Sequence, residues 1–540
     1  MNEEIETVEV KKQKPQVFFN SITFNDGTKM SLRNNSIVVF TGANNSGKSQ
    51  VLRDAENCVN SSTSVDPIVI KDVTLDYLGE VDEPDFLDRH FMINGKGEYL
   101  AFEASYSTSL ENLKSYWQRH NLVNGLHNVF IKRLGTELRL TVSNALKRDY
   151  NAEKHPIFKL LKSDTLTRKL LDYFHQAFGE DLVVNRNEMQ TVPLHVGKAP
   201  NSKSFTMDMH DDYYEALAAL PKLQEQGDGM RSFVSILLDT FTSERSITLI
   251  DEPEAFLHPP QARILGKMLA KNNPNNRQLF ISTHSEDFLQ GLLDADNENV
   301  TVVRINRENN LNKMSVLQND EIKKLWSNPI LRYSNILSGL FHEKVVVCES
   351  DYDCLFYQAL INAIYEQKGE LAPDILFTHC GGKARAKDVV VALKAVNVPV
   401  VSICDFDLLD QSQYFKPLIK AFGAEWSTIL SSGMKTIYDS MNGKSKEGNN
   451  AWERIKKIGK SGFADDEPAA YEKVEVMCKS IGLFVVPVGE MECFDKTINK
   501  QKKDWVYHVL ENYDLATELK LESARKFIEE VVDYRLSESD

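Results

Sequence analysis

Residues 37–49 read Ile-Val-Val-Phe-Thr-Gly-Ala-Asn-Asn-Ser-Gly-Lys-Ser, an apolar run that passes directly into a glycine-bounded loop. The run predicts a buried strand, and residues 49–57 predict a helix behind the loop. The backbone N–H groups of such a loop, together with the helix N-terminus, can surround phosphate groups. The sequence therefore predicts a nucleoside triphosphate site formed by Gly42, Asn44, Asn45, Ser46, Gly47, Lys48, Ser49 and Gln50.

A second apolar run, residues 247–250, ends in Asp251 and Glu252. In sites of this kind the loop lysine, Lys48, reaches the terminal phosphates and the following Ser49 binds Mg²⁺. We expect Asp251 to lie on the metal side of the site and Glu252 to polarise the attacking water. Acid pairs also end many ordinary strands, so this prediction depends on the combination with Lys48.

Carboxylates also follow two apolar strands in the back half of the chain. Glu349 and Asp353 come after the first strand, and Asp405 and Asp407 come at the end of the second. Alternate residues of a strand share a face, so we expect these side chains to meet at one sheet edge. Crowded carboxylates need a compensating cation, and oxygen ligands suit Mg²⁺ or Mn²⁺ in two-metal phosphodiester cleavage. Acids that merely end strands remain the structural alternative.

Length and composition limit the class of protein. The chain has 540 residues, enough for two or three domains, and its 42% apolar and 26% charged residues are typical of soluble globular proteins. No long apolar stretch or signal-like start is visible, so we expect a cytoplasmic protein without a membrane partner. The net charge of −15 means that any nucleic-acid binding must use local basic clusters.

Three further motifs resemble those of the ATP-binding-cassette (ABC) ATPases, and the resemblance covers residues 17–310. Leu-His-Pro at 257–259 is similar to that family's dimer-contact loop, and Ser-Thr-His-Ser at 282–285 is similar to its switch-histidine segment. Residues 226–232 resemble the start of its signature helix, although they depart from the usual Leu-Ser-Gly-Gly-Gln. The resemblance implies a homodimer that sandwiches ATP, with His284 sensing the γ-phosphate.

The acidic pattern resembles the TOPRIM domain over residues 343–495, with Gly-Gly-Lys at 381–383 as the intervening glycine turn and Ser350 in place of the usual glycine. An ABC-type ATPase followed by TOPRIM is the layout of the OLD-family nucleases. That resemblance implies two added metal ligands, Glu490 and Glu492. It also implies a lysine that stabilises the transition state, for which the candidates are Lys496, Lys500, Lys502 and Lys503, with Lys503 preferred.

The expected fold class is α/β: an ABC-type P-loop ATPase domain with a helical insertion, then a TOPRIM domain with a Rossmann-like parallel sheet. The expected segments are a flexible tail 1–15, an ATPase domain 16–320 with an insertion at about 105–195 that could serve dimerisation, a linker helix 321–342, and the TOPRIM domain with C-terminal helices 343–540. Within the insertion, a strand is expected at residues 138–142.

These observations lead to the hypothesis of an ATP-regulated, divalent-metal-dependent DNA endonuclease of OLD type, at least dimeric. Proteins with this layout commonly serve in anti-phage defence, including Gabija-like and retron-associated systems. The resemblance therefore implies DNA, and either a reverse transcriptase with its single-stranded DNA or another defence subunit, as partners. One alternative is a non-cleaving ATPase scaffold or DNA clamp with TOPRIM as a docking module. A topoisomerase-like strand transferase is disfavoured because no segment remains for a DNA gate.

Overall fold

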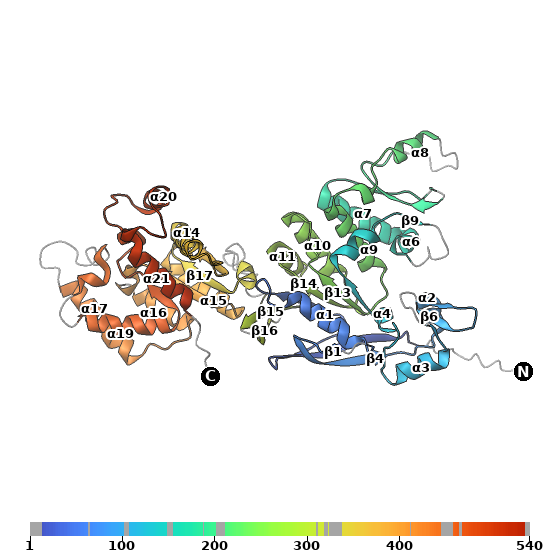
Figure 1. Ribbon diagram of the computed structural model, residues 1–540, viewed down its shortest axis with the longest axis horizontal. Coiled ribbons are helices and arrows are strands. Elements are labelled where there is room, and N and C mark those ends of the chain that lie inside the picture. The colour runs from blue at the N-terminus through green and yellow to red at the C-terminus, as the bar shows by residue number, and fades with distance from the viewer. Residues whose placement is uncertain are drawn as a thin grey trace, which may run out of the picture. The chain divides into compact units, whose positions relative to one another are not determined.

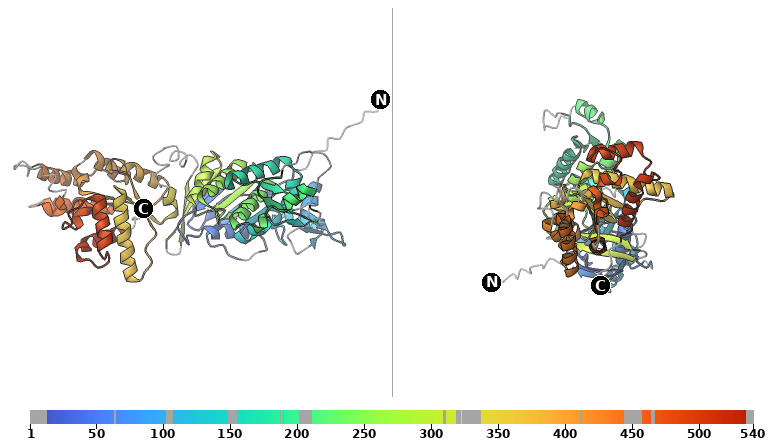
Figure 2. Two further views of the ribbon diagram at one scale, coloured as in Figure 1. Left: turned by 90° about the horizontal axis from the view of Figure 1, so that it is seen from above. Right: turned by 90° about the vertical axis from the view of Figure 1, so that its left-hand side faces the viewer.

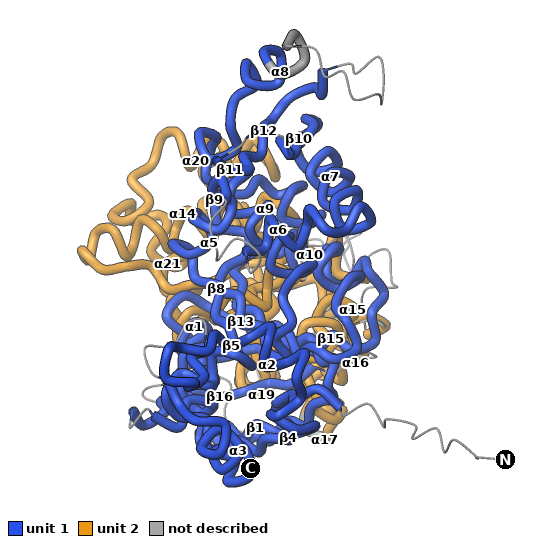
Figure 3. Tube along the Cα trace, turned by 90° about the vertical axis from the view of Figure 1, so that its right-hand side faces the viewer, with its two compact units in different colours: residues 1–320 blue, residues 321–540 orange. Residues whose placement is uncertain are grey.

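The computed structural model describes two compact units, residues 1–320 and 321–540 (Figure 3). The described residues are 13–62, 65–101, 107–147, 155–186, 188, 190–200, 211–308, 311–317, 322, 337–410, 412–443, 457–463 and 467–534. Most of the expected tail and most of the expected linker helix lie outside these residues. Among the described residues, no helix combines the length and the apolar character needed to cross a membrane.

A six-stranded sheet forms the centre of the first unit (Figure 1). Its order is β16 (Leu311–Leu317), β15 (Val300–Glu308), β3 (Ile37–Thr41), β14 (Gln278–Ser282), β13 (Ile247–Asp251) and β8 (Ile131–Leu134). The strands from β15 to β8 are parallel, and β16 pairs with β15 in the antiparallel sense. Every residue of β3 and β14 is buried, as expected for parallel strands covered on both faces.

Helix α1 (Lys48–Val59) covers one face of this sheet and separates it from a second, antiparallel sheet (Figure 1). The second sheet has the order β2 (Lys29–Ser31), β1 (Gln16–Phe24) and β4 (Ile70–Leu78). Apolar residues of β1, β3 and α1 share one core. The start of α1 is thereby fixed directly behind the loop that leaves β3.

Four packed helices lie away from α1 in the same unit: α7 (Asp164–Phe178), α9 (Asp228–Thr242), α10 (Pro259–Asn272) and α11 (Glu286–Asp294). Helices α10 and α11 approach each other closely at Gly291. A Cβ atom at that position would lie 2.0 Å from the carbonyl oxygen of Arg263, so only glycine fits there.

The expected insertion at about 105–195 is mostly helical but also builds the central sheet. Its longer elements are α3 (Leu110–Gln118), α5 (Thr136–Val142), α6 (Pro156–Leu161) and α7. The prediction of a strand at residues 138–142 is wrong, because this segment lies in α5. Leu138 is 41% exposed whereas Arg139 is fully buried, so the leucine faces solvent and the arginine faces the interior, the reverse of what a strand with buried leucines would show. The strand of this region that joins the central sheet is β8, which pairs with β13.

Shorter elements complete the first unit. They are α2 (Pro84–His90), α4 (His127–Phe130), α8 (Asp211–Ala218), β5 (Phe91–Ile93), β6 (Tyr99–Ala101), β7 (Ser107–Thr108), β9 (Leu146–Lys147), β10 (Leu182–Val184), β11 (Thr191–Val192) and β12 (Leu194–Val196).

The second unit contains a four-stranded sheet in the order β18 (Ile375–His379), β17 (Lys344–Cys348), β19 (Val400–Cys404) and β20 (Leu483–Val485). All neighbouring strands in it are parallel, which confirms the predicted parallel layering. Chain order reverses at β17, because the chain passes first to β18 on one side and then to β19 on the other. Ligands of open parallel sheets bind at the carboxyl ends of strands at such a switch point.

Helices cover this sheet on both faces (Figures 1 and 2). Helix α14 (Asp351–Lys368) packs against α20 (Lys502–Asn512) and α21 (Glu522–Asp533), with the Trp505 side chain fully buried among them. Helices α15 (Lys383–Ala395), α16 (Ser412–Ala421), α17 (Thr428–Gly443) and α19 (Glu467–Ser480) complete the unit. Helix α14 begins at a capping box formed by Ser350 and Asp353 and ends at Gly369, whose φ is 68°.

Candidate functional site

Glycine is required at both ends of the loop between β3 and α1. Gly42 has φ 141°, and a Cβ atom there would lie 2.2 Å from the carbonyl oxygen of Ile305. Gly47 has φ 104° and occupies the N-cap of α1. The backbone therefore wraps tightly at the helix N-terminus, where N–H groups and the helix dipole favour an anion.

Lys48 is buried at the base of this loop, with 4% of its surface exposed. Its Nζ donates hydrogen bonds to the carbonyl oxygens of Gly42 at 2.8 Å and Ala43 at 2.7 Å. The ammonium group is thus already held inside the loop in which a phosphate would bind.

The structure brings Ser49 next to Asp251, although they are 202 residues apart. Ser49 Oγ donates to Asp251 Oδ1 at 2.8 Å, and Ser282 Oγ donates to the same oxygen. These are a hydroxyl in the first turn of α1, a carboxylate at the end of β13 and a hydroxyl at the end of β14, a suitable donor set for Mg²⁺.

Other predicted loop residues have contacts of their own. Gln50 donates to Asp54 Oδ1 at 2.8 Å, so its amide is engaged along α1. Asn44 and Asn45 are exposed, and Ser46 is buried with its carbonyl oxygen accepting from the Asn312 amide. Phosphate contacts by these four side chains stay predictions.

Glu252 and His284 face each other beside the loop. Glu252 Oε1 lies 3.1 Å from His284 Nε2, and the Glu252 backbone takes a left-handed conformation with φ 48°. Burial, followed by the positive charge of Lys48, lowers the pKa of His284 below its ordinary value. A neutral imidazole next to the glutamate can accept or donate a proton at a bound water.

Two residues of this site were missed in the sequence. Arg139, fully buried in α5, donates from Nη1 to the carbonyl oxygen of Glu252 at 3.0 Å. Glu254 Oε1 accepts from the His284 backbone N–H at 2.7 Å and from Thr283 Oγ1 at 2.8 Å. Burial raises the pKa of Glu254. Glu254 could have been noticed from its place two residues after Glu252, whereas Arg139 carries no pattern beyond a charge between leucines.

The signature-like segment packs against the loop that follows the acid pair. Helix α9 begins at Asp228, and a Cβ atom at Gly229 would lie 2.5 Å from the carbonyl oxygen of Phe256. Arg231 donates to the Leu140 carbonyl oxygen at 2.6 Å, which ties α9 to α5. The start of α9, the loop after β13 and α5 are therefore in mutual contact within one chain.

In the second unit, three carboxylates converge at the switch point of the sheet. Glu349 follows β17 and Asp405 follows β19, which are neighbouring parallel strands. One oxygen each from Glu349, Asp405 and Asp407 lies within 4.8 Å of the others, and within the described residues no other His, Cys, Asp or Glu group is gathered in this way. Glu349 Oε1 also accepts from the Asp405 backbone N–H at 3.0 Å.

Asp407 reaches this cluster by a different route from the one expected. The strand stops at Cys404, and residues Phe406–Asp410 form a 3₁₀ helix. The explanation that Asp405 and Asp407 share a strand face is therefore wrong, because it is the tight helical turn that returns Asp407 to the edge.

Burial and mutual repulsion disfavour charge on Glu349 and Asp405. Burial raises the pKa of Glu349 to about 7, and burial together with Glu349 raises the pKa of Asp405 well above its usual value. Lys383, at the start of α15, donates from Nζ to Asp407 Oδ2 and is the nearby cation that the sequence analysis did not assign. Its position after two glycines, between the acidic strands, was the available signal. Glu349 and Asp405, which resist ionisation, and the buried Asp407 beside them fit a divalent cation, whose charge would favour the ionised forms of Glu349 and Asp405.

Of the other predicted residues, Asp353 and Glu490 lie close enough for their charges to raise the pKa of Asp405, but neither belongs to the three-carboxylate cluster found among the described residues. Asp353 Oδ2 accepts from the Ser350 backbone N–H at 2.8 Å and so caps α14. Glu492 Oε1 accepts from the Lys502 backbone N–H at 2.6 Å. Glu490 lies close enough for its charge to raise the pKa of Asp405, whereas Lys503 Nζ lies 5.5 Å from the Tyr507 ring centroid.

One family model matches within the first unit. Residues 37–289 match the family described as "AAA domain, putative AbiEii toxin, Type IV TA system". The OLD nuclease of Thermus scotoductus (strain ATCC 700910 / SA-01) is 26% identical over 245 residues, which are 42% of this chain and 43% of that protein. The match thus spans less than half of that relative's length.

Two solved structures have weak overall likeness to the chain. The SMC head domain from Thermotoga maritima is 9% identical with a TM-score of 0.29, covering 57% of this chain and 100% of that one. The Smc head domain with an extended coiled coil, bound to the C-terminal domain of ScpA derived from Pyrococcus furiosus, is 11% identical with a TM-score of 0.32, covering 58% and 99%.

The family match covers the loop after β3, the acid pair after β13 and His284, which the fold brings together. The first unit therefore has the P-loop ATPase fold with mixed α/β sheets, and this fold implies nucleotide binding. Over part of its length, the chain is similar to an OLD nuclease.

Proposed function

We propose that the chain is an ATP-regulated, divalent-metal-dependent DNA endonuclease of OLD type, and that its second unit is a TOPRIM nuclease domain. The observation that carries the proposal is the convergence of Glu349, Asp405 and Asp407 at the carboxyl ends of adjacent parallel strands. Similarity to an OLD nuclease supports the same function.

The acidic cluster holds the metal ion in this proposal, and Lys383 acts on the substrate. Glu349, Asp405 and Asp407 hold the cation, and Glu490 lies beside Asp405 as a further ligand. Bound Mg²⁺ or Mn²⁺ supplies the activation of water and the neutralisation of the leaving oxygen. Lys383, whose Nζ contacts Asp407 at the cluster, would offer its ammonium group to the substrate phosphate.

The ATPase site provides the regulation in this proposal. Lys48 binds the terminal phosphates, Ser49 and Asp251 hold Mg²⁺, and Glu252 with His284 handles the attacking water. ATP drives pairing of two copies, and pairing controls access of DNA to the acidic cluster. We place the protein in the cytoplasm as an anti-phage effector, with a reverse transcriptase and its single-stranded DNA, or another defence subunit, as the candidate partner.

Cleavage of plasmid DNA with Mn²⁺, in the presence and absence of ATP, tests the proposal. Glu349→Ala is expected to abolish nicking, a loss of at least about a hundredfold, with nucleotide binding unchanged. Glu370→Gln, an exposed acid beyond the end of α14, is the matched control and should cut like the wild type. Persistent cutting by Glu349→Ala would remove this cluster from the mechanism.

The ion pair between Lys383 and Asp407 favours one second candidate, a non-cleaving ATPase clamp whose second unit serves only for docking. An internal counter-ion is what a non-catalytic carboxylate cluster would retain. Intact plasmid under every nucleotide and metal condition would support the clamp.

A further inference from the structure

A basic cleft lies at the amino ends of the strands of the central sheet, away from the phosphate loop. Two adjoining cavities of about 460 and 680 Å³ share Arg89, Glu244 and Arg245 in their walls. Phe130 and Arg277, which immediately precede β8 and β14, also line the first cavity. The phosphate loop follows the carboxyl end of β3, which is parallel to β14, so the two places are separated by roughly 15 Å, the length of a five-residue strand.

The charge of this cleft is opposite to that of the whole chain. Eight lysine and arginine side chains line the two cavities against three carboxylates, whereas the chain as a whole has a net charge of −15. Such a local concentration of positive charge favours an anion.

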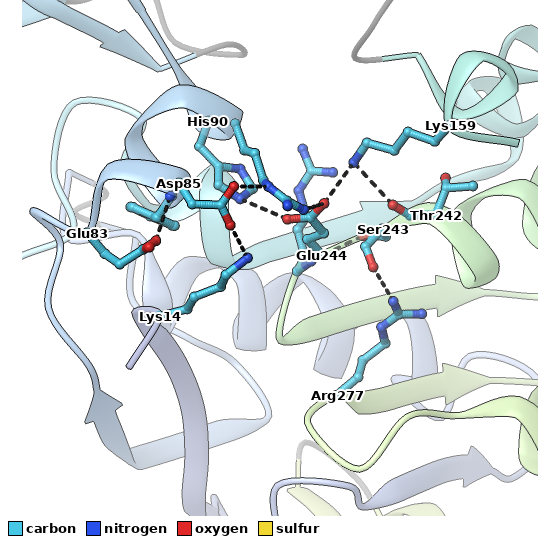
Figure 4. Close-up of polar contacts among 12 residues, drawn as sticks. Lys14, Glu83, Asp85, His90, Lys159, Thr242, Ser243, Glu244 and Arg277 are labelled. Atoms are coloured by element: carbon cyan, nitrogen blue, oxygen red, sulfur yellow. Dashed lines mark hydrogen bonds and ion pairs between the residues drawn. The ribbon is translucent and has the colours of Figure 1, made fainter. Parts of the chain in front are cut away.

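Glu244 is the internal counter-ion of the cleft (Figure 4). Its carboxylate lies 2.9 Å from Arg89 Nη1, 3.6 Å from Lys159 Nζ and 3.8 Å from His90 Nε2. Burial opposes its ionisation, but Lys159 and Arg89 lower the pKa of Glu244 below the usual value, so it carries its charge. Arg89 also pairs with Asp85 at 2.8 Å, and Asp85 in turn pairs with Lys14. Burial lowers the pKa of His90 to about 4, so His90 adds no charge. Arg89, Lys159 and Lys14 therefore face two carboxylates, and one positive charge is left over.

Arg277 adds a buried cation beside the same cavity. It is 5% exposed, and its guanidinium donates to the carbonyl oxygens of Thr240, at 2.7 Å, and Ser243. In the described part of the chain no carboxylate lies within ion-pair distance of Arg277, and its Nε is buried with no hydrogen-bond partner there. A buried guanidinium with one unsatisfied N–H group is unfavourable, and an anion in the cavity would reduce that cost.

We infer that this cleft binds a nucleoside phosphate, with its phosphate at Arg89 and Lys159 in competition with Glu244. Arginine is suited to bidentate contact with phosphate. The cavity volumes fall within the range of about 300–1,000 Å³ that small ligands and nucleotides occupy. A free nucleotide and the 5′-phosphorylated end of a DNA strand present the same chemical group.

The test uses the full chain carrying Lys48→Ala, which removes the lysine of the loop site. Fluorescence anisotropy measures binding of labelled ADP and of a 5′-phosphorylated single strand, each against its unphosphorylated twin. Both Arg89→Gln and Lys159→Gln should weaken binding of the phosphorylated probe by about tenfold, whereas Glu244→Gln should strengthen it severalfold. A gain of affinity cannot arise from misfolding, so Glu244→Gln keeps the test decisive.

Lys96→Gln makes the same charge change as Lys159→Gln at an exposed turn away from the cleft and should leave affinity unchanged. The probe that is bound more tightly identifies the source of the phosphate. Equal weakening by Lys96→Gln, weaker binding by Glu244→Gln, or no preference for phosphorylated probes would each overturn the inference.

Discussion

Lys383 at the start of α15 forms an ion pair with Asp407, 24 residues later, in the 3₁₀ helix after β19. The pair places a cation among the three carboxylates that would bind a metal. The Lys383 charge also lowers the pKa of Glu349, although burial outweighs it. Lys383 and a divalent cation therefore compete for the same carboxylates.

Replacing Lys383 tests this competition. Lys383→Gln should tighten Mn²⁺ binding by about tenfold, because the metal no longer displaces an ammonium group, while DNA cleavage slows. Isothermal titration calorimetry gives the affinity, and Lys387→Gln on the same helix is the control. Unchanged Mn²⁺ affinity in Lys383→Gln would show that the ion pair does not oppose the metal.

Metal binding should depend on pH through the same carboxylates. Because the pKa of Glu349 is raised to about 7, the metal-free cluster holds a proton below that pH, and the incoming cation must release it. Affinity for Mn²⁺ should therefore fall as the pH is lowered from about 8 to 6. Calorimetry in buffers of different ionisation enthalpy counts the protons released, and a pH-independent affinity would contradict this origin.

The same raised pKa has a defined effect on stability. The folded metal-free protein binds this proton more tightly than the unfolded chain, so its stabilising contribution is present at low pH and is lost as the pH rises from about 4.5 through about 7. Thermal unfolding of Glu349→Gln should lose this pH dependence relative to the wild type. An identical pH dependence in both proteins would assign it to other groups.

Arg139 is predicted to position Glu252 in the ATPase site. Arg139→Gln removes the hydrogen bond to the Glu252 carbonyl oxygen and should lower the kcat of ATP hydrolysis by roughly tenfold, with a smaller change in KM. Arg119→Gln, an exposed arginine after α3, is the matched control. A fall in melting temperature with an unchanged kcat would mean that Arg139 serves folding alone.

Two glycines of the signature-like segment provide a matched pair. A Cβ atom at Gly229 would collide with the Phe256 carbonyl oxygen, whereas at Gly227 no heavy atom lies within 4 Å. Gly229→Ala should destabilise the first unit by about 1–3 kcal/mol and slow ATP hydrolysis, while Gly227→Ala should be close to neutral. Denaturant unfolding and ATPase assays measure both, and equal effects would refute the close approach.

How much was predictable differs between the two units. The phosphate loop and the acid pair follow from local sequence, because the loop with Lys48 and Ser49 comes directly after one recognisable apolar strand and Asp251 ends another. The meeting of Glu349 with Asp405 follows from their positions directly after two parallel strands, because the carboxyl ends of parallel strands lie at the same end of the sheet. These features are apolar strands and the polar residues that follow their ends, and both can be recognised in a single sequence.

The missed features depend on contacts distant in sequence. The sequence around Arg139 does not indicate that its guanidinium contacts the carbonyl oxygen of Glu252, 113 residues away. A short run with alternating leucines fits a strand or a helix equally well, and tertiary packing selected α5. Likewise, only the 3₁₀ turn after Cys404 determines that Asp407 folds back toward Lys383.

The pairing of β8 with β13 constrains how this chain can be shortened. Strand β8 comes from within residues 105–195, so excising that whole stretch would strip β13 of its outer neighbour. A ladder of unpaired backbone groups would then face solvent, which is a template for aggregation. Any minimal ATPase fragment must therefore retain Ile131–Leu134 even if the surrounding helices are trimmed.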